Sequence, residues 1–440
     1  KNVPEDRRCI KCKWVFKVKR NGTKRARLVA CGYSQVPGVD FTESFLPVVN
    51  DMTYRIVLIL MVVLKLEGWL IDVETAFLNG QLEEEIYMNV PEGYKCGNLD
   101  QKLRLKKGCY GLVQAARQWW KRIVEILKSL GFQGGDVDPC LMQRKGAKGI
   151  VIICLYVDDM LTIGNEVELE KFAEELKREG LKITVEKELK EYLGCKVIKE
   201  KEGKGLWLRQ DYIIKGLERK IGPFIEKEKV TKAFKTPGTP RCNILQGGEE
   251  DLIDEEEGSL FRTGVGTLLY LVKHTRPDLA NAVRELSKVL SKPTKTAFKE
   301  MLRVSKYVLD TREKGLKVFP MMKMVKNNLL NWVMIMFSDS DYAGDKDTRI
   351  SVTGYVLFLL GVAIVWKSKA QKGVTLSSSE AEFVALSEAV KEVLFVLRLL
   401  NSMGIKVELP IKVMVDNKGA IFMANNVAIS QRTKIGRAHV

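Results

Sequence analysis

Two adjacent aspartates interrupt a stretch of apolar residues. Residues 150–155 are apolar, Tyr156-Val-Asp-Asp159 follows, and residues 160–163 are again mostly apolar. Burying two neighbouring carboxylates in a β-hairpin is very unfavourable unless they are paired or bind a metal ion. Neighbouring side chains of a strand point to opposite faces, so we expect a turn that lets Asp158 and Asp159 approach one site. The alternative is a surface turn without a chemical role.

A third carboxylate, Asp72, lies near the end of another strand-like stretch, residues 68–73. Asp72, Asp158 and Asp159 together offer the hard oxygen ligands that Mg²⁺ prefers, and Mg²⁺ keeps further positions for water and phosphate. Two such ions about 4 Å apart can activate a 3′-hydroxyl group and stabilise a leaving pyrophosphate. We therefore interpret the three residues as a candidate site for nucleotidyl transfer.

A second set of acidic residues lies in the last quarter of the chain. Asp339 follows the apolar residues 333–337, and Asp416 ends the strand-like residues 411–416. Asp341 is an alternative to Asp339, which we prefer because it lies nearer to the end of its strand. Both strands therefore are expected to end in an acid.

A long helix is predicted between these two strands. Its potential N-caps are the serines at residues 377–379. Glu382 lies one turn before the predicted buried stripe and faces the core, which is unusual for an acid. We interpret Glu380 as a solvated acid that suits the helix dipole. The predicted stripe consists of Leu386, Ala389, Val393 and Leu397.

The first thirty residues are strongly basic, with 11 Lys and Arg against 2 Asp and Glu. Basic residues alternate with Trp14, Phe16 and Val18 and resume after a predicted turn at Asn21-Gly22, which indicates a β-hairpin. A Lys-rich edge strand would show the same pattern. We favour a surface that contacts phosphates, because the charge is so concentrated.

The remaining elements follow from periodicity and turn signals. A second basic stretch leads into a helix that contains Trp119-Trp120. The best linker candidate contains two prolines and an acidic cluster. In chain order we predict the basic stretch at 102–122, a charged helix at 166–179, the linker at 235–257, a helical segment at 259–312 and a last αβ unit from 331 onward.

Composition limits the possible functions. The chain has 440 residues and a formal net charge of +17, which favours nucleic acid as a partner. Only two histidines are present, so mechanisms that need several His ligands are nearly excluded. Nine scattered cysteines indicate reduced thiols, and Cys9-x-x-Cys12 lacks the second pair that a zinc site needs. No apolar run reaches the roughly 18 residues of a membrane span.

Several longer motifs occur in a characteristic order, and together they closely resemble the polymerase of copia-type long-terminal-repeat retrotransposons. The resemblance covers nearly the whole chain. Its motifs are Arg27-Leu-Val-Ala-Cys-Gly-Tyr-Ser-Gln35, Gly38-Val-Asp-Phe-Thr-Glu-Ser-Phe-Leu-Pro-Val-Val49, Asp72-Val-Glu-Thr-Ala-Phe-Leu-Asn-Gly80, Glu85-Ile-Tyr-Met88, Tyr110-Gly-Leu-Val-Gln-Ala-Ala-Arg-Gln-Trp119, Tyr156-Val-Asp-Asp159 and Tyr192-Leu-Gly194.

The resemblance implies an α+β right-hand polymerase with fingers, palm and thumb, followed by an α/β RNase H-like domain that is truncated at its C-terminus. The expected segments are residues 1–234 for the polymerase fingers, palm and start of the thumb, 235–330 for a linker and helical connection, and 331–440 for the incomplete RNase H-like domain. The turn Tyr192-Leu-Gly194 resembles the one that grips the primer end, although an ordinary strand turn would look the same. His274 is expected to lie in the connection without a catalytic role.

The resemblance also implies roles for individual residues around the nucleotide. Asp72, Asp158 and Asp159 match the metal-binding carboxylates. Phe77 matches the aromatic residue that rejects a 2′-hydroxyl group, and a core Phe is the alternative. The other matches are Thr75 and Ala76 through their backbone N–H groups, Gln114 as a lining residue of the nucleotide pocket, and Lys24, Arg25 or Arg27 as contacts to the triphosphate.

In the C-terminal part, Asp339, Glu382 and Asp416 resemble the carboxylates with which RNase H holds two Mg²⁺ ions and cleaves RNA in a hybrid. The fourth carboxylate is expected after residue 434, where the chain instead reads Ile435-Gly-Arg-Ala-His-Val440. We therefore expect this chain to lack RNase H activity, and we expect it to be an internal piece of a longer polyprotein because it begins with Lys.

The predicted function is RNA- and DNA-directed DNA synthesis with Mg²⁺, or Mn²⁺, as cofactor. The expected partners are an RNA template, a DNA primer, an RNA/DNA hybrid and dNTPs, without a membrane, and with Gag and other Pol segments in the full polyprotein. The resemblance implies a virus-like particle in the cytoplasm, with the nucleus as an alternative. Two other functions stay open: an inactive retroelement remnant that only binds nucleic acid, and a stand-alone two-metal nuclease, which does not explain the polymerase motifs.

Overall fold

A computed structural model describes residues 3–4, 7–18, 22–94, 102–240, 242–321, 324–325 and 329–426 of the chain. The chain divides into two compact units. The first contains residues 1–50 and 67–188, and the second contains residues 51–66 and 189–440. The boundaries predicted after residues 234 and 330 both fall inside the second unit, and the division into three segments stays a prediction.

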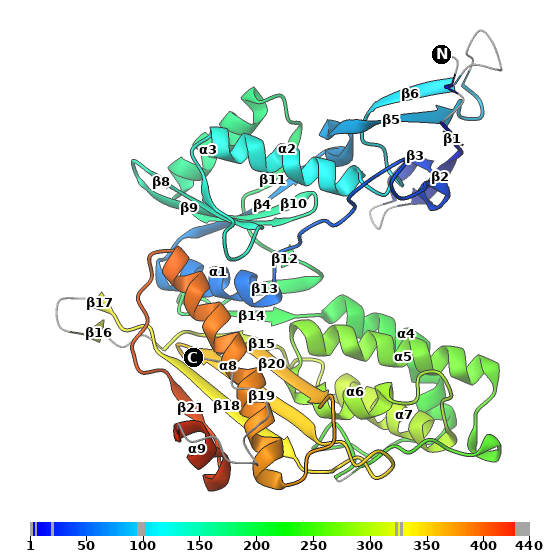
Figure 1. Ribbon diagram of the computed structural model, residues 1–440, viewed down its shortest axis with the longest axis vertical. Helices are drawn as coiled ribbons and strands as arrows, with labels where there is room; N and C mark the ends of the chain where they lie inside the picture. The colour runs from blue at the N-terminus through cyan, green and yellow to red at the C-terminus, as the bar shows by residue number, and fades with distance from the viewer. Residues whose placement is uncertain are drawn as a thin grey trace. The chain divides into compact units, whose positions relative to one another are not determined.

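A six-stranded antiparallel sheet forms the centre of the first unit, in the order β11-β4-β10-β9-β8-β7 (Figure 1). The apolar run of residues 150–155 forms most of β9 and is buried in the sheet, as its composition predicts. Asn165 caps the following helix by accepting a hydrogen bond from the Val167 N–H group. The strands are β4 (Glu67–Val73), β7 (Gln133–Gly134), β8 (Leu141–Gly146), β9 (Gly149–Tyr156), β10 (Asp159–Gly164) and β11 (Ile183–Glu186), and the helices are α2 (Ala115–Ser129) and α3 (Glu166–Arg178).

The expected basic hairpin is confirmed. Its two strands pair antiparallel, with Cys12 opposite Ala30 and Val18 opposite Lys24. Of the predicted turn, Asn21 lies outside the described residues, and Gly22 has a φ of +81°. The hairpin consists of β2 (Cys12–Val18) and β3 (Lys24–Ala30), and a separate sheet contains β1 (Cys9–Ile10), β5 (Gln81–Asn89) and β6 (Lys102–Lys107); two short 3-10 helices are η1 (Gly32–Ser34) and η2 (Ala76–Asn79).

The helices between residues 211 and 310 share one apolar core in the second unit, which includes Phe261, Val265, Met301 and Leu302. Short polar side chains at the helix starts accept backbone hydrogen bonds, Asp254 for α5 and Thr294 for α7. The helices are α1 (Asp51–Val63), α4 (Asp211–Lys227), η3 (Glu249–Asp251), α5 (Glu255–His274), η4 (Pro277–Leu279), α6 (Ala280–Ser287) and α7 (Lys295–Asp310), and a four-stranded sheet contains β12 (Glu191–Tyr192), β13 (Cys195–Lys199), β14 (Leu206–Arg209) and β15 (Leu316–Val318).

The predicted linker lies inside this unit and packs against it. Ile244 belongs to the helical core, and its N–H group donates to the Glu285 carboxylate at 3.1 Å. Helix α5 begins at Glu255, within the residues predicted as linker. The acidic cluster that suggested a linker therefore supplies part of the first turn of a helix, where acids favour the helix dipole.

The C-terminal αβ unit is present where it was expected. Its sheet has the order β20-β19-β18-β21, and α8 packs on β18 and β19 (Figure 1). The strands β18 and β21 run parallel, whereas the other neighbours are antiparallel. The elements are β16 (Met324–Val325), β17 (Leu329–Leu330), β18 (Met334–Asp341), β19 (Val352–Leu359), β20 (Val362–Ala370), α8 (Ser378–Ser402), β21 (Lys412–Met414) and α9 (Lys418–Asn425).

The buried stripe of α8 differs from the prediction. Leu386 and Leu397 are only half-buried, so their assignment to the stripe was wrong. The buried positions are spaced so that small side chains face the sheet, which allows the helix to pack closely. Glu382 is buried as predicted, and the remaining stripe consists of Ala385, Ala389, Val393, Val396 and Leu400.

Helix α1 packs against β20, although about 300 residues separate them in the chain. The guanidinium group of Arg55 donates to the carbonyl groups of Ile364 and Lys273 and lies over the ring of Trp366. The indole N–H group of Trp366 donates to the Val272 carbonyl at 2.8 Å. These bonds join α1, the end of α5 and the C-terminal sheet within the second unit.

Candidate active sites

The strand register brings the first carboxylate set together. Asp159 pairs directly with Asp72 on one side and with Tyr156 on the other. Asp158 lies in the turn between β9 and β10, and its carbonyl accepts a hydrogen bond from the Val73 N–H group at 3.1 Å. Three residues that lie in two distant stretches of the sequence are thus neighbours at one end of the sheet.

The turn itself has an unusual backbone. Val157 has a φ of +58°, in the left-handed region that β-branched residues rarely adopt. Its carbonyl accepts the indole N–H group of Trp119 at 2.7 Å. This bond holds the turn in the conformation that lets Asp158 and Asp159 lie at the same end of the sheet.

The electrostatics of this set favour a bound cation. The pKa of Asp159 is raised to about 6, chiefly by burial and then by the charges of Asp158, Asp72 and Glu186 in that order of importance. A divalent cation would remove this mutual repulsion, and the oxygen donors fit Mg²⁺. Glu186 on β11 was not recognised from the sequence, and no local signal pointed to it.

Two of the predicted nucleotide contacts lie around one aromatic ring. Phe77 is half-buried, and its ring centroid lies 5.1 Å from that of Tyr110. The guanidinium carbon of Arg27 lies 4.7 Å from the centroid of the same ring. The buried Nε of Arg27 has no hydrogen-bond partner within the described part of the chain. Among the three basic candidates, Arg27 therefore contacts the Tyr110 ring beside Phe77, while Lys24 is exposed at the start of β3 and Arg25 is partly exposed.

The other predicted nucleotide contacts differ in accessibility. Thr75 is exposed and has a φ of +55°, and Ala76 is buried at the start of η2. Gln114 is completely buried, where its amide donates to the Asp40 carbonyl at 2.9 Å and to Glu84 at 3.2 Å, and accepts from Gln35 at 3.0 Å. In this structure the Gln114 side chain thus holds protein groups together.

The turn Tyr192-Leu-Gly194 joins β12 to β13 in the second unit. Leu193 has a φ of +49° and Gly194 a φ of +72°, as in the tight turns of two-residue hairpins. The hydroxyl group of Tyr270 donates to the Leu193 carbonyl at 3.0 Å. This geometry is compatible with both interpretations of the motif.

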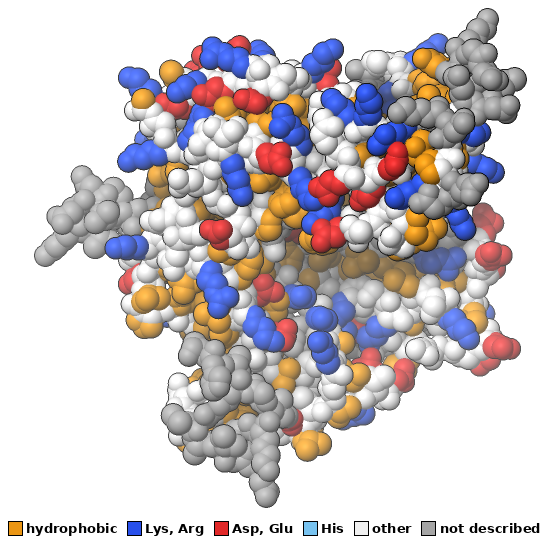
Figure 2. Space-filling view, turned by 45° about the horizontal axis from the view of Figure 1, so that its top comes forward, with side chains coloured by type: hydrophobic (Ala, Val, Ile, Leu, Met, Phe, Trp, Pro, Cys, Tyr) orange, Lys and Arg blue, Asp and Glu red, His pale blue; other side chains and the backbone are white. Residues whose placement is uncertain are grey.

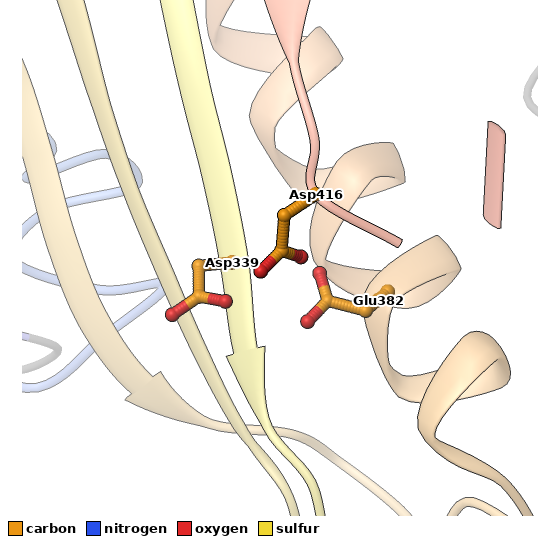
Figure 3. A group of neighbouring side chains, drawn as sticks. All are labelled: Asp339, Glu382 and Asp416. Carbon is orange, nitrogen blue, oxygen red and sulfur yellow. The ribbon is translucent and has the colours of Figure 1, made fainter. Parts of the chain in front are cut away.

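The second carboxylate set forms a compact cluster. Asp339 on β18, Glu382 on α8 and Asp416 after β21 each offer an oxygen within 4.8 Å of the others, and they lie side by side in Figure 3. Across the described ranges of the chain, no other group of three or more His, Cys, Asp or Glu ligands is this close. Asp341 is not part of the cluster, which agrees with the choice of Asp339. The reason for that choice was wrong, because β18 extends to Asp341 and Asp339 lies inside the strand.

Glu382 anchors this cluster. One carboxylate oxygen accepts a hydrogen bond from the Ser340 N–H group at 2.9 Å, and the other is buried without a partner within the described residues. Burial raises the pKa of Glu382, the Ser340 N–H group lowers it, and the neighbouring Asp339 and Asp416 raise it. The orphaned oxygen and the three converging carboxylates fit a divalent cation.

Asp416 is held through its neighbour. The hydroxyl group of Ser379, at the start of α8, donates to the Asn417 side chain at 3.1 Å. The same Asn417 oxygen accepts the Ala420 N–H group and so caps α9. These bonds tie the segment that carries Asp416 to the helix that carries Glu382, a contact that the sequence did not suggest.

A basic groove lies between α4 and α5 in the second unit. It has a volume of about 700 Å³ and contains Gly216, Gly266 and the two tyrosines Tyr212 and Tyr270. Four cations line it, and none of them forms an ion pair with another described residue. An added side chain at Gly216 or Gly266 would meet open space, so internal packing does not explain these two helical glycines. The four cations are Lys215, Arg219, Lys220 and Arg262.

Basic charge is spread widely over the surface. Lys and Arg side chains are distributed over the visible face and interspersed with acids (Figure 2). Within the described ranges, none of the helices combines the length and apolar character that a membrane-spanning segment requires. The two thiols of Cys9 and Cys12 both donate to Asn89, through its side-chain and backbone oxygens.

Comparison with known proteins identifies the class. The model of the family described as reverse transcriptase (RNA-dependent DNA polymerase) matches residues 1–224. The chain therefore belongs to the reverse transcriptase family, and the mixed α/β fold of the matched part is consistent with this assignment.

The similarity extends to copia-type Pol polyproteins, as the motifs predicted. The chain is 36% identical over 446 aligned positions to the retrovirus-related Pol polyprotein from transposon TNT 1-94 of Nicotiana tabacum. The alignment covers 98% of the chain and 32% of the relative. It is 33% identical to the corresponding polyprotein from transposon RE2 of Arabidopsis thaliana, over 97% of the chain and 28% of the relative. The putative transposon Ty5-1 protein of Saccharomyces cerevisiae is 30% identical over 73% of the chain and 100% of its own length. The chain thus spans about a third of the length of the two plant polyproteins.

Proposed function

We propose that the chain is an RNA- and DNA-directed DNA polymerase of a copia-type retrotransposon, which adds deoxynucleotides to a primer 3′-hydroxyl group. The observation that carries the proposal is the strand register that places Asp72 opposite Asp159, beside the turn that contains Asp158. Membership of the reverse transcriptase family supports it.

Asp72, Asp158 and Asp159 would hold two Mg²⁺ ions, with Mn²⁺ as an alternative. When bound, such a pair activates the 3′-hydroxyl group and stabilises the leaving pyrophosphate. The paired strands fix the backbone of Asp72 opposite that of Asp159, and the side-chain oxygens of the three residues would have to draw together when the cations bind. The raised pKa of Asp159 indicates that its charge lacks compensation without them.

The Tyr110 neighbourhood would form the nucleotide pocket. Phe77 would exclude a 2′-hydroxyl group by its bulk, and Arg27 would contact the triphosphate after leaving the Tyr110 ring. The exposed Thr75 and the adjacent Ala76 would offer backbone N–H groups to the phosphates. Gln114 would support the nucleotide pocket from the protein interior, because its side chain is buried and forms hydrogen bonds with Gln35 and Asp40.

We assign the parts of a right-hand polymerase as follows. The fingers contain the basic hairpin β2–β3 and the sheet β1-β5-β6, the palm contains the six-stranded sheet, and the thumb begins with α4. The helical connection and an RNase H-like domain complete the chain, with the boundaries expected from the sequence.

The groove between α4 and α5 supports binding of nucleic acid. Its four cations have no ion-pair partner among the described residues, and phosphate groups would supply one. The glycines Gly216 and Gly266 leave room for a close approach of a sugar–phosphate backbone. Tyr270 connects this groove to the turn at residues 192–194, which we propose as the contact to the primer end.

We further propose that Asp339, Glu382 and Asp416 bind divalent cations as in RNase H. When bound, such cations activate a water molecule for attack on the RNA strand of a hybrid. The fourth expected carboxylate would follow residue 434, which lies outside the described residues. Cation binding, rather than cleavage, is therefore the direct test of this cluster.

Primer extension tests the polymerase proposal. The chain is given a DNA primer on an RNA template and dNTPs with Mg²⁺, and Asp158→Asn is compared with Asp136→Asn, an exposed aspartate of the same unit. Loss of a metal ligand removes several kcal/mol of transition-state stabilisation, so Asp158→Asn should be slower by about 1,000-fold or more. Asp136→Asn should match the unmodified chain.

Two outcomes would contradict the proposal. Equal extension by the unmodified chain and Asp158→Asn would show that the metal site is wrong. Absence of extension together with retained, salt-dependent binding of the primer–template would favour the inactive remnant. Partners beyond template, primer and dNTPs, including Gag and other Pol segments in a virus-like particle, belong to the longer relatives and are proposed here by similarity alone.

A further inference from the structure

Aromatic side chains from α1 and α5 hold the turn at residues 192–194 from both sides. On one side, the ring of Tyr54 contacts the ring of Tyr192 edge-on, with centroids 5.8 Å apart. On the other side, the hydroxyl group of Tyr270 donates to the Leu193 carbonyl at 3.0 Å. A Cβ atom at Gly194 would lie 3.1 Å from the Tyr270 oxygen, so the turn and this hydroxyl group are closely fitted.

His274 lies between these two tyrosines and contacts both. Its Nδ1 is 3.3 Å from the Tyr54 hydroxyl oxygen, and its ring meets the Tyr270 ring edge-on with centroids 4.7 Å apart. His274, Tyr54 and Tyr192 are all buried. Contacts thus run without a gap from Tyr192 through Tyr54 and His274 to Tyr270, and from there to Leu193.

His274 is neutral in this surrounding. The pKa of His274 is lowered to about 4, chiefly by burial and then by the nearby cations Lys273 and Arg55. Burial likewise raises the pKa of Tyr54, so this phenol keeps its proton. With the imidazole proton on Nε2, Nδ1 accepts the hydrogen bond of Tyr54.

The turn needs such support because of its backbone. Leu193 has a φ of +49°, and a residue with a Cβ atom in this region is disfavoured by about 1 kcal/mol or more. Two-residue turns with a carbonyl that is not held can also open locally. The Tyr270 hydrogen bond restrains Leu193, and the Tyr54–Tyr192 ring contact restrains the residue before it. A histidine that only filled the core would not need to contact both Tyr54 and Tyr270.

We propose that His274 and Tyr270 are positioning residues that fix the turn at residues 192–194 and thereby orient the primer end for nucleotide addition. The inference rests on the proposed polymerase function, and it adds a role for a histidine that the sequence placed outside catalysis. Displacement of a reacting group by about 1 Å can slow a reaction about 100-fold, so a small movement of this turn is sufficient to matter.

The first test is amide hydrogen exchange, which does not depend on activity. Tyr270→Phe removes only the hydroxyl group that holds Leu193, and His274→Phe keeps a ring but removes the acceptor for Tyr54. Both changes should speed exchange of the amides at residues 193–195 about tenfold, as expected for the loss of one hydrogen bond. Tyr342→Phe is the matched control, because Tyr342 is exposed in the turn that follows β18. Unchanged exchange in both variants would overturn the inference.

The second test is steady-state primer extension by the same variants. We expect kcat to fall about tenfold or more, while KM for dNTP and the affinity for primer–template stay within about twofold, because the turn orients the primer without binding the nucleotide. His274→Asn retains an acceptor near the position of Nδ1 and should recover part of the loss seen with His274→Phe.

The two levels of the proposal fail in different ways. If the unmodified chain does not extend primers, the polymerase function fails, while the exchange data still decide whether the turn is held by these residues. If exchange increases but kcat is unchanged in an active chain, the contacts are merely structural and the positioning role is overturned.

Discussion

The two carboxylate sets are built in different ways. In the first unit, Asp72 and Asp159 are direct partners on paired strands, and Asp158 lies in the adjoining turn. In the second unit, the acids come from a strand, a helix and the segment after another strand. The first set is positioned by backbone pairing, whereas the second depends on α8, which packs on β18 and β19 and against α9. The first should therefore tolerate side-chain changes nearby, and the second should not.

The charges are also balanced differently. Asp159 has three acidic neighbours, and its pKa rises to about 6. Glu382 is buried near Asp339 and Asp416, yet the Ser340 N–H group compensates part of this unfavourable environment. A cation should therefore relieve more repulsion at the first set than at the second.

The largest expected effect is that a substitution in one carboxylate set impairs that set and leaves the other unchanged. Asp159→Asn should lower primer extension by about 1,000-fold or more and leave cation binding at the second cluster unchanged. Glu382→Gln should weaken cation binding at the second cluster and leave primer extension unchanged. Primer extension and Mn²⁺ binding followed by electron paramagnetic resonance measure the two properties. A loss of both properties in either variant would show that the two sets do not act independently.

A smaller effect is expected from the support of Asp416. Ser379→Ala removes the hydroxyl group that holds Asn417, and loss of such a supporting contact typically weakens metal binding about tenfold. Mn²⁺ titration in an Asp158→Asn background reports the second cluster alone. Ser378→Ala, at the exposed neighbouring position, is the control and should leave the affinity unchanged. If Ser379→Ala and Ser378→Ala bind Mn²⁺ with equal affinity, the Ser379–Asn417 hydrogen bond does not position Asp416.

The pH dependence of the first unit should expose the repulsion around Asp159. A raised carboxyl pKa contributes stability that is complete below about pH 4 and is lost as the pH rises through 6. Without divalent cations, the free energy of unfolding of the unmodified chain should therefore fall between pH 5 and pH 8. Relative to Asp159→Asn, the fall should be about 1 kcal/mol after allowance for solvent screening. Native-state hydrogen exchange in β10 measures this unit, and Mg²⁺ should abolish the difference. A parallel pH profile in the variant would contradict the assignment.

The smallest effect concerns the turn of the first set. Val157→Gly relieves the left-handed backbone but increases the freedom of the unfolded chain, so a net stabilisation of about 0.5 kcal/mol is expected. The same exchange measurement in β9 and β10 detects it. Destabilisation instead would indicate that packing of the Val157 side chain outweighs the strain of its backbone.

The sequence predicted those features that depend on nearby residues. The hairpin around Asp158 and Asp159, the N-cap of α8 and the helical segment predicted at 259–312 follow from local patterns, and the structure contains them. Asp72 and the second carboxylate set were proposed from strand ends and from the family resemblance, and the structure brings each set together. Their chemical roles stay predictions.

Features that depend on distant contacts were not predicted. The stripe of α8 was placed at Leu386 and Leu397 because large apolar residues suggest a core, but the sheet accepts the small Ala385 and Ala389 at close range. The hydrogen bond from Gln114 to the Asp40 carbonyl joins residues 74 positions apart, and the one between Tyr54 and His274 joins residues 220 positions apart. Neither leaves a periodic signal, because each is defined by the packing of separate elements.

The packing of α1 against β20 has a consequence for synthesis of the chain. Arg55 bonds to the carbonyl group of a residue that lies 309 positions later. At about 5 to 20 residues per second, a ribosome needs roughly 15 to 60 s to make the intervening polypeptide. During that time the apolar face of α1 lacks its final partner while the flanking strands are already available to fold. The nascent chain should therefore depend on chaperones at this stage, and late arrival of β20 would complete the second unit only after most of the protein has emerged.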